Sequence, residues 1–450
     1  MAQTAEQISN HIKAQYPTLE ERYTSMAKAE GISVSFEQLK EQLAWSINAI
    51  ETARAIHRVH CITELYLTKS DSELYNVLHL AEPHQRSALI ALTVLDATKA
   101  CKEASTAYTS ATGNPPLKDS VPAFFDMLHS CPEQYPLFKA LGKPGQEYIQ
   151  KNIFYIHLRH LQFGEVPTSS LNAFKETLNE AQEIARQKLQ LMSAFWLANL
   201  LGFEKISDGT RGEEQFSTAS KERVAEFFRV DETLKKCISE KSLEPMQNFY
   251  ETTLASSQVD FKESSVNEKA LLGRLYALLN DRYGRETMPE IFAKIAKHKG
   301  LMQKISELAV LEEQQFSTFK LQAITFLPAV YWKLDEIMDK APIEDKLMRY
   351  VQLQIQLLQS VPTFMDTLDR DRSIPLFSIK ENKDGFLEKL IRSPENVEFK
   401  LSVNSPFLTV SGTLKPVLSA AIVKGGPTLY TDGKSEDPST QAKHKPELNT

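Results

Sequence analysis

The chain has 450 residues, of which 42% are hydrophobic and 24% are charged, and its formal net charge is −6. This hydrophobic content excludes an intrinsically disordered chain, whose composition combines low hydrophobicity with high net charge. The acidic balance excludes a globally basic nucleic-acid-binding protein and disfavours nucleic acid as a partner. Glycine is scarce, with 16 residues, which argues against glycine-rich phosphate loops and turn-dense β-sandwiches.

Helical periodicity dominates from the start of the chain to about residue 392, because long segments are rich in Leu, Ala, Glu, Gln and Lys. Three helix starts have the pattern of a capping box, at Ser35 with Gln38, at Ser70 with Glu73 and at Thr287 with Glu290. Gly202 is expected to end a helix in the left-handed conformation. The predicted helices are 4–28, 36–68, 72–80, 84–107, 121–130, 146–163, 170–201, 219–240, 243–256, 266–283, 288–298, 300–327, 329–340, 343–360 and 384–392.

The helical region is interrupted by a polar, glycine-containing stretch at 204–215. Stretches of this composition are typical of boundaries between compact units. The sequence therefore predicts a mainly α fold, a multi-helix bundle in two lobes that span residues 1–205 and 216–392.

Beyond Arg392 the pattern changes from helical to alternating. Apolar residues occupy every second position from Val397 to Val403, which is the period of a β-strand, and turn-forming residues follow. A small antiparallel β element is therefore expected over 393–430. Residues 431–450 contain almost no apolar side chains, so we expect a disordered tail there.

The cysteines indicate a reducing compartment. They form no CxxC pair and are too sparse for a disulfide scaffold; they are Cys61, Cys101, Cys131 and Cys237. No signal-peptide pattern opens the chain, so a cytoplasmic location is expected. The most apolar stretches, 194–203 and 323–332, are about half as long as the ~20 residues of a membrane-spanning helix. No transmembrane segment is predicted, while contact with a membrane surface stays open because 320–332 is strongly apolar.

Histidine placement is the most unusual feature of the sequence. Two pairs have i, i+3 spacing within predicted helices, His57 with His60 and His157 with His160. Residues three apart lie about 60° apart around a helix, so each pair shares one helix face. In the first helix, the apolar stripe that begins at Phe36 continues through polar positions; these are Arg54, His57, Cys61 and Glu64.

If the two histidine helices pack together, their polar residues line one pocket. The candidate residues are Arg54, His57, His60, Glu64, His157, Arg159 and His160. The four imidazoles of His57, His60, His157 and His160 suit a divalent metal ion. Arginine and protonated histidine equally suit phosphate or another anion. The alternative is an ordinary amphipathic bundle whose histidines find protein partners, and the sequence names no cofactor.

Two further groups are weaker candidates. Asp335, Glu336 and Asp339 resemble the DDxxD pattern with which helical isoprenoid synthases bind Mg²⁺, although a solvated acidic helix end is the more typical origin of such a group. Cys61 beside His57 and His60 is the one Cys/His pairing that the sequence suggests for nucleophilic catalysis. Neither group establishes that the protein is an enzyme.

The last twenty residues resemble the C-terminal export signals of type IV (Dot/Icm-type) secreted effectors of intracellular bacteria. Such tails are polar and acidic, with a hydrophobic residue near the end, and Glu436, Asp437 and Leu448 match this pattern. Positive charge at Lys443 and Lys445 departs from it. The resemblance implies delivery into a host cell, where large helical proteins commonly bind host factors or membranes.

These features predict a helical interaction protein, a translocated effector that acts on host-cell proteins. The alternative is a metal- or phosphate-dependent helical enzyme or ligand-binding protein that uses the His/Arg/Glu pocket. The two readings differ in one geometric property, which is whether His57 and His157 converge.

Overall fold

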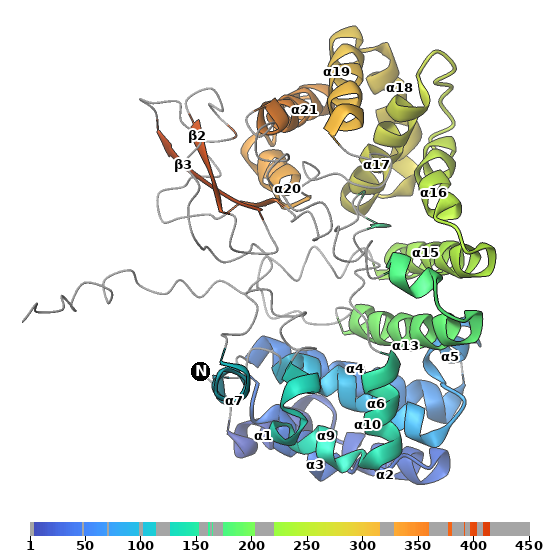
Figure 1. The fold of residues 1–450 in the computed structure, drawn as a ribbon, viewed down its shortest axis with the longest axis vertical. Helices are drawn as coiled ribbons and strands as arrows, with labels where there is room; N and C mark the ends of the chain where they lie inside the picture. The colour runs from blue at the N-terminus through green and yellow to red at the C-terminus, as the bar shows by residue number, and fades with distance from the viewer. Residues whose placement is uncertain are drawn as a thin grey trace, which may run out of the picture.

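The fold is mainly α, as the sequence predicts (Figure 1). A computed structural model describes residues 4–46, 49–69, 72–98, 102–113, 127–152, 161–162, 164, 174–202, 220–315, 328–359, 377–379, 391, 397–402 and 408–414. Helices make up most of these residues.

The first half of the chain forms a bundle of helices, coloured blue to green in Figure 1. These helices are α1 (Ala5–Gln15), α2 (Leu19–Glu30), α3 (Phe36–Leu43), α4 (Ala49–Thr68), α5 (Ser72–Leu78), α6 (Pro83–Leu95), α7 (Lys102–Thr112), α9 (Pro136–Ala140), α10 (Gly142–Asn152) and α13 (Gln182–Leu201). Short 3-10 turns, η1 (Asp96–Thr98) and η2 (Pro132–Gln134), connect some of them.

The second half continues with helices that lie above the first bundle in Figure 1. They are α15 (Ser220–Glu240), α16 (Glu244–Ala255), α17 (Val266–Tyr283), α18 (Met288–Lys297), α19 (Lys299–Gln315), α20 (Pro328–Ile337) and α21 (Ile343–Gln359), with a 3-10 turn, η3 (Arg285–Thr287), before α18.

Three short strands pair near the end of the described residues. They are β1 (Phe377–Ile379), β2 (Val397–Ser402) and β3 (Leu408–Leu414), in the order β1-β3-β2. β2 and β3 are antiparallel, with Val397 opposite Leu414. β1 runs parallel to β3 and lies before the range that the sequence analysis assigned to this element. A separate antiparallel unit over 393–430 stays a prediction.

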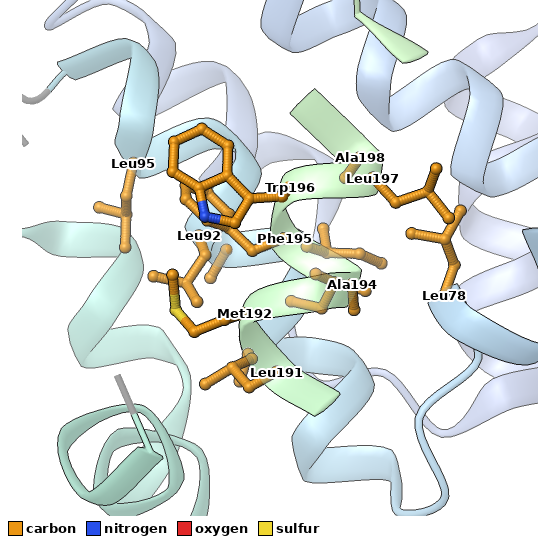
Figure 2. Close-up of a cluster of buried hydrophobic side chains, with 14 of the residues drawn as sticks. Leu78, Leu92, Leu95, Leu191, Met192, Ala194, Phe195, Trp196, Leu197 and Ala198 are labelled. Atoms are coloured by element: carbon orange, nitrogen blue, oxygen red, sulfur yellow. The ribbon is translucent and has the colours of Figure 1, made fainter. Parts of the chain in front are cut away.

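The apolar side chains gather in two clusters. The first extends from Ile8 to Tyr250 along the chain and also includes Ala277, and the second extends from Leu254 to Ile391. α13 lies at the centre of the first cluster, because every residue from Leu191 to Asn199 is buried. Figure 2 shows its side chains between those of α5 and α6, with the labelled contacts Leu78, Leu92 and Leu95. The stretch 204–215 lies outside the described residues, so the two predicted lobes, 1–205 and 216–392, stay a prediction.

From α13 onward, the main helices pack one on the next. The sequence of contacts is α13, α15, α16, α17, α19 and α21, and we call these six helices the helix stack. A hydrogen bond and an ion pair fix the alignment of two members: Glu268 of α17 accepts a hydrogen bond from Ser306 of α19, and Arg274 of α17 pairs with Glu312 of α19. Both partners advance by six residues (268 to 274, 306 to 312), so α17 and α19 run parallel while α18 returns the chain between them.

Two long predicted helices are each divided in the structure. The predicted helix 4–28 is interrupted after Gln15, because Pro17 has no N–H to donate and restricts the backbone of Tyr16 before it. The predicted helix 36–68 ends at Leu43. Beyond it, backbone amides bond to carbonyl oxygens three residues earlier, as the amide of Ser46 does to the carbonyl oxygen of Leu43. Phe36 therefore lies on α3 and the histidines lie on α4, so they do not share one continuous apolar stripe.

The left-handed cap predicted at Gly202 is wrong. The φ of Gly202 is −65°, which is right-handed. Glycine is needed there for space, since a Cβ at this position would lie 2.6 Å from Nε of Arg58. The end of α13 lies against the Arg58 side chain of α4, which explains why glycine occupies position 202. No sequence pattern predicts this contact.

Candidate functional site

The polar residues of α4 are held inside the bundle. α4 packs against α2, α6 and α13, so that Glu51, Thr52, His57, Arg58 and Thr63 are buried together with its apolar residues. Buried polar groups require partners, because an unpaired one loses hydration without compensation. The partners that these side chains contact therefore define the site on α4.

His57 is only 4% exposed, and both of its ring nitrogens contact protein atoms. Nδ1 lies 2.9 Å from Oη of Tyr16, and Nε2 lies 3.5 Å from Sγ of Cys61. Tyr16 follows the last residue of α1 and caps that helix, with its amide bonded to the carbonyl of Ile12. The end of α1 thus brings a phenol over the histidines of α4.

His60 takes part in the same cluster. Its ring lies 4.8 Å from the ring of Tyr16 and 6.1 Å from that of His57, measured between centroids. Burial and the charge of the nearby Cys61 raise the pKa of Tyr16. Tyr16 is therefore a neutral phenol at neutral pH, with an oxygen that can donate or accept a hydrogen bond.

The two charged candidates of α4 are paired with neighbours. Arg54 donates from Nη1 to Oε1 of Glu51 at 2.7 Å, one turn away on the same helix. Glu64 accepts two hydrogen bonds from the guanidinium of Arg22 on α2, of which Nη2 to Oε2 measures 2.6 Å. This two-bond geometry is the preferred one for arginine and carboxylate. Arg54 and Glu64 are thus bound to different partners.

The second half of the predicted pocket falls outside the described residues. His157, Arg159 and His160 belong to 153–160, and the convergence of the two histidine pairs stays a prediction. Within the ranges that the structure describes, no group of three or more His, Cys, Asp or Glu side chains is arranged to bind a metal ion. The tail residues Glu436, Asp437 and Leu448 also lie outside these ranges.

A buried ion pair beside the cluster escaped the sequence analysis. Nη1 of Arg58 lies 3.0 Å from Oδ2 of Asp96 in η1 and 3.4 Å from the carbonyl oxygen of Thr93. The side chains of Arg58 and Asp96 are almost fully buried, so the pair joins α4 to the end of α6. The sequence showed apolar neighbours, Ile56, Val59 and Ile62, on that part of α4, but nothing that located the partner carboxylate.

The acidic group at the end of α20 has a structural role. Asp335 accepts hydrogen bonds from Nε of Arg282 at 2.8 Å, from the phenol of Tyr283 at 2.6 Å and from Nζ of Lys346 at 2.7 Å. Burial opposes the charged form of Asp335, but these three donors outweigh it and hold the pKa of its carboxyl below the usual value. The carboxylate that would bind Mg²⁺ is thus used to join α17, α20 and α21.

Two findings bear on the class of protein. In the part of the chain covered by the structure, no helix has both the length and the apolar character needed to cross a membrane. Comparison of the chain with protein-family models, with curated proteins and with solved structures finds no match.

Proposed function

We propose that the protein acts by binding a partner protein along the helix stack. The observation that carries this proposal is the consecutive packing of the helix stack, in which each helix contacts the next along the chain of six. Arrays of this kind leave an extended series of helix faces uncovered, and such surfaces suit binding of other proteins.

Exposed apolar side chains support this proposal. Among the described residues, the large hydrophobic side chains that remain exposed are Leu67, Ile184, Val266 and Val310. Three of them lie on the stack: Ile184 on α13, Val266 on α17 and Val310 on α19. Val266 and Val310 are 51% and 52% exposed, and they lie on two helices that pack side by side.

Replacing Val310 tests the stack as a binding surface. We expect Val310→Lys to reduce by about tenfold, or about 1.4 kcal/mol, the amount of partner that the protein captures from host-cell lysate, because a charged ammonium would have to lose its hydration where an apolar side chain made contact. Quantitative mass spectrometry of the captured proteins is the measurement.

Leu67 provides the matched control, since it is 36% exposed and lies on α4, outside the stack. Leu67→Lys should capture the same proteins as the wild type, and far-UV circular dichroism should be unchanged in both variants. Equal capture by Val310→Lys and Leu67→Lys, together with equal capture by Val266→Lys, would contradict binding along the stack.

We also propose that residues 431–450 direct export of the protein into a host cell, where the stack meets its partner. The support is the composition of the tail, with Glu436 and Asp437 followed by Leu448. Residues 393–430 would form the small β element that links the helical part to this tail, and the support is the alternation of apolar residues from Val397 to Val403.

Deletion of 431–450 tests the export proposal. In a bacterium with a Dot/Icm-type secretion system, we expect the deletion to abolish delivery of a reporter enzyme fused to the N-terminus of the protein, while the far-UV circular dichroism of the purified protein is retained. Delivery of the truncated fusion at the level of the full-length fusion is the contrary outcome, and the binding proposal would be unaffected by it.

A further inference from the structure

Cys61, His57 and Tyr16 form a continuous row of a thiol, an imidazole and a phenol. Sγ of Cys61 lies 3.5 Å from Nε2 of His57, and Nδ1 of His57 lies 2.9 Å from Oη of Tyr16. His57 and Cys61 are four residues apart on α4, a spacing that brings two side chains together on one helix face. Because His57 is nearly fully buried, packing restricts the imidazole to this orientation.

The row has the parts of an activated nucleophile. A thiol becomes reactive when an adjacent base takes its proton, and the base is most effective when a third group orients it. If Nε2 of His57 accepts from the thiol of Cys61, the other ring proton resides on Nδ1 and is donated to the oxygen of Tyr16. Tyr16 is a neutral phenol and can accept this hydrogen bond.

Cys61 differs in burial from the other cysteines that the structure describes. Cys61 is half-buried, whereas Cys131 and Cys237 are buried. Burial raises the pKa of Cys131, and it raises the pKa of Cys237 to about 12. These two cysteines are inert thiols of the same chain, and they serve as references for Cys61.

We propose that Cys61 is a nucleophilic site for small, uncharged electrophiles, with His57 as its base and Tyr16 as the residue that positions His57. In the reaction with a haloacetamide, Sγ of Cys61 forms a bond to carbon as the carbon–halogen bond breaks. Halide leaves with the bonding electron pair, and the thiol proton moves to Nε2 of His57. The partial burial of Cys61 limits the site to small reagents. This inference is independent of the binding and export proposals.

The rate of alkylation in the native and the denatured chain tests the proposal. The full-length protein is treated with iodoacetamide at neutral pH, and mass spectrometry follows the labelling of each cysteine. A half-buried thiol without a base should react more slowly in the native chain than in denaturant. We expect Cys61 to react at least about tenfold faster in the native chain, while Cys131 and Cys237 react only after denaturation. A native rate at Cys61 equal to or below the denatured rate overturns the proposal.

Variants of the base and of its neighbour separate chemistry from packing. General-base assistance commonly contributes about a hundredfold or more, so His57→Gln should remove the native rate advantage of Cys61, and added imidazole should restore part of it in His57→Ala. In Tyr16→Phe the ring packing on His60 is kept, but the ¹⁵N chemical shifts of His57 should lose the preference for a proton on Nδ1. An unchanged tautomer in Tyr16→Phe would refute the positioning role. If the His57 variants do not fold, the wild-type comparison still decides the proposal.

Discussion

Arg274→Met is expected to lower the free energy of unfolding by about 3–5 kcal/mol, which is the cost of removing one partner from a buried ion pair. Arg274 on α17 and Glu312 on α19 are each 1% exposed. Without the guanidinium, the carboxylate of Glu312 stays buried between two parallel helices with its main counter-charge removed. Denaturant unfolding followed by circular dichroism measures the change.

The double variant Arg274→Met/Glu312→Leu is the control for this interpretation. Replacing a buried ion pair by apolar residues of similar volume is often neutral or stabilising. We therefore expect the double variant to regain most of the stability that Arg274→Met loses. A single variant as stable as the wild type would show that Glu312 finds another counter-charge or reaches water.

The second large effect is expected from a single added methyl group. A Cβ at Gly273 of α17 would lie 2.0 Å from the carbonyl oxygen of Tyr250 on α16. The opposing atom belongs to the backbone, so no change of rotamer relieves the overlap and the two helices must separate. Overpacking typically costs about 1–3 kcal/mol, and we expect Gly273→Ala to reach or exceed the upper end of that range in thermal or denaturant unfolding.

Gly300 is the matched control for Gly273. It is the second residue of α19, and the nearest atom to an added Cβ there is Cε of Met348, at 3.4 Å. Because alanine favours the helix over glycine by up to about 1 kcal/mol, Gly300→Ala should be neutral or slightly stabilising. If Gly273→Ala behaves like Gly300→Ala, the close approach of α16 and α17 is not present in solution.

The sequence predicts the helices better than their ends. The capping box at Ser35 forms, with reciprocal hydrogen bonds to Gln38. It is predictable because the two residues are three positions apart and need no other part of the chain. The box predicted at Thr287 does not form, since its hydroxyl donates instead to the carbonyl oxygens of Tyr283 and Gly284 in the preceding turn. A further box forms at Ser265 with Glu268, which the sequence analysis did not identify although it has the same pattern.

The candidate site shows the same limit at a larger scale. Helical spacing was enough to place His57 and Cys61 on one face of α4, and the structure puts them in contact. Tyr16, which follows α1, and Arg22 of α2 lie 41 and 42 residues along the chain from their partners His57 and Glu64. Contacts at such separations depend on how the helices pack, and periodicity within one helix carries no information about them.

The two apolar clusters meet within a single turn of helix, since Tyr250 belongs to the first and Leu254 to the second. α17 repeats this arrangement, with Ala277 in the first cluster and its neighbours Tyr276 and Leu278 in the second. We expect helices shared in this way to couple the unfolding of the two clusters. A fragment that ends before α16 would lack the side chains that α16 adds to the first cluster. A fragment that begins at α16 would expose those same apolar side chains to water.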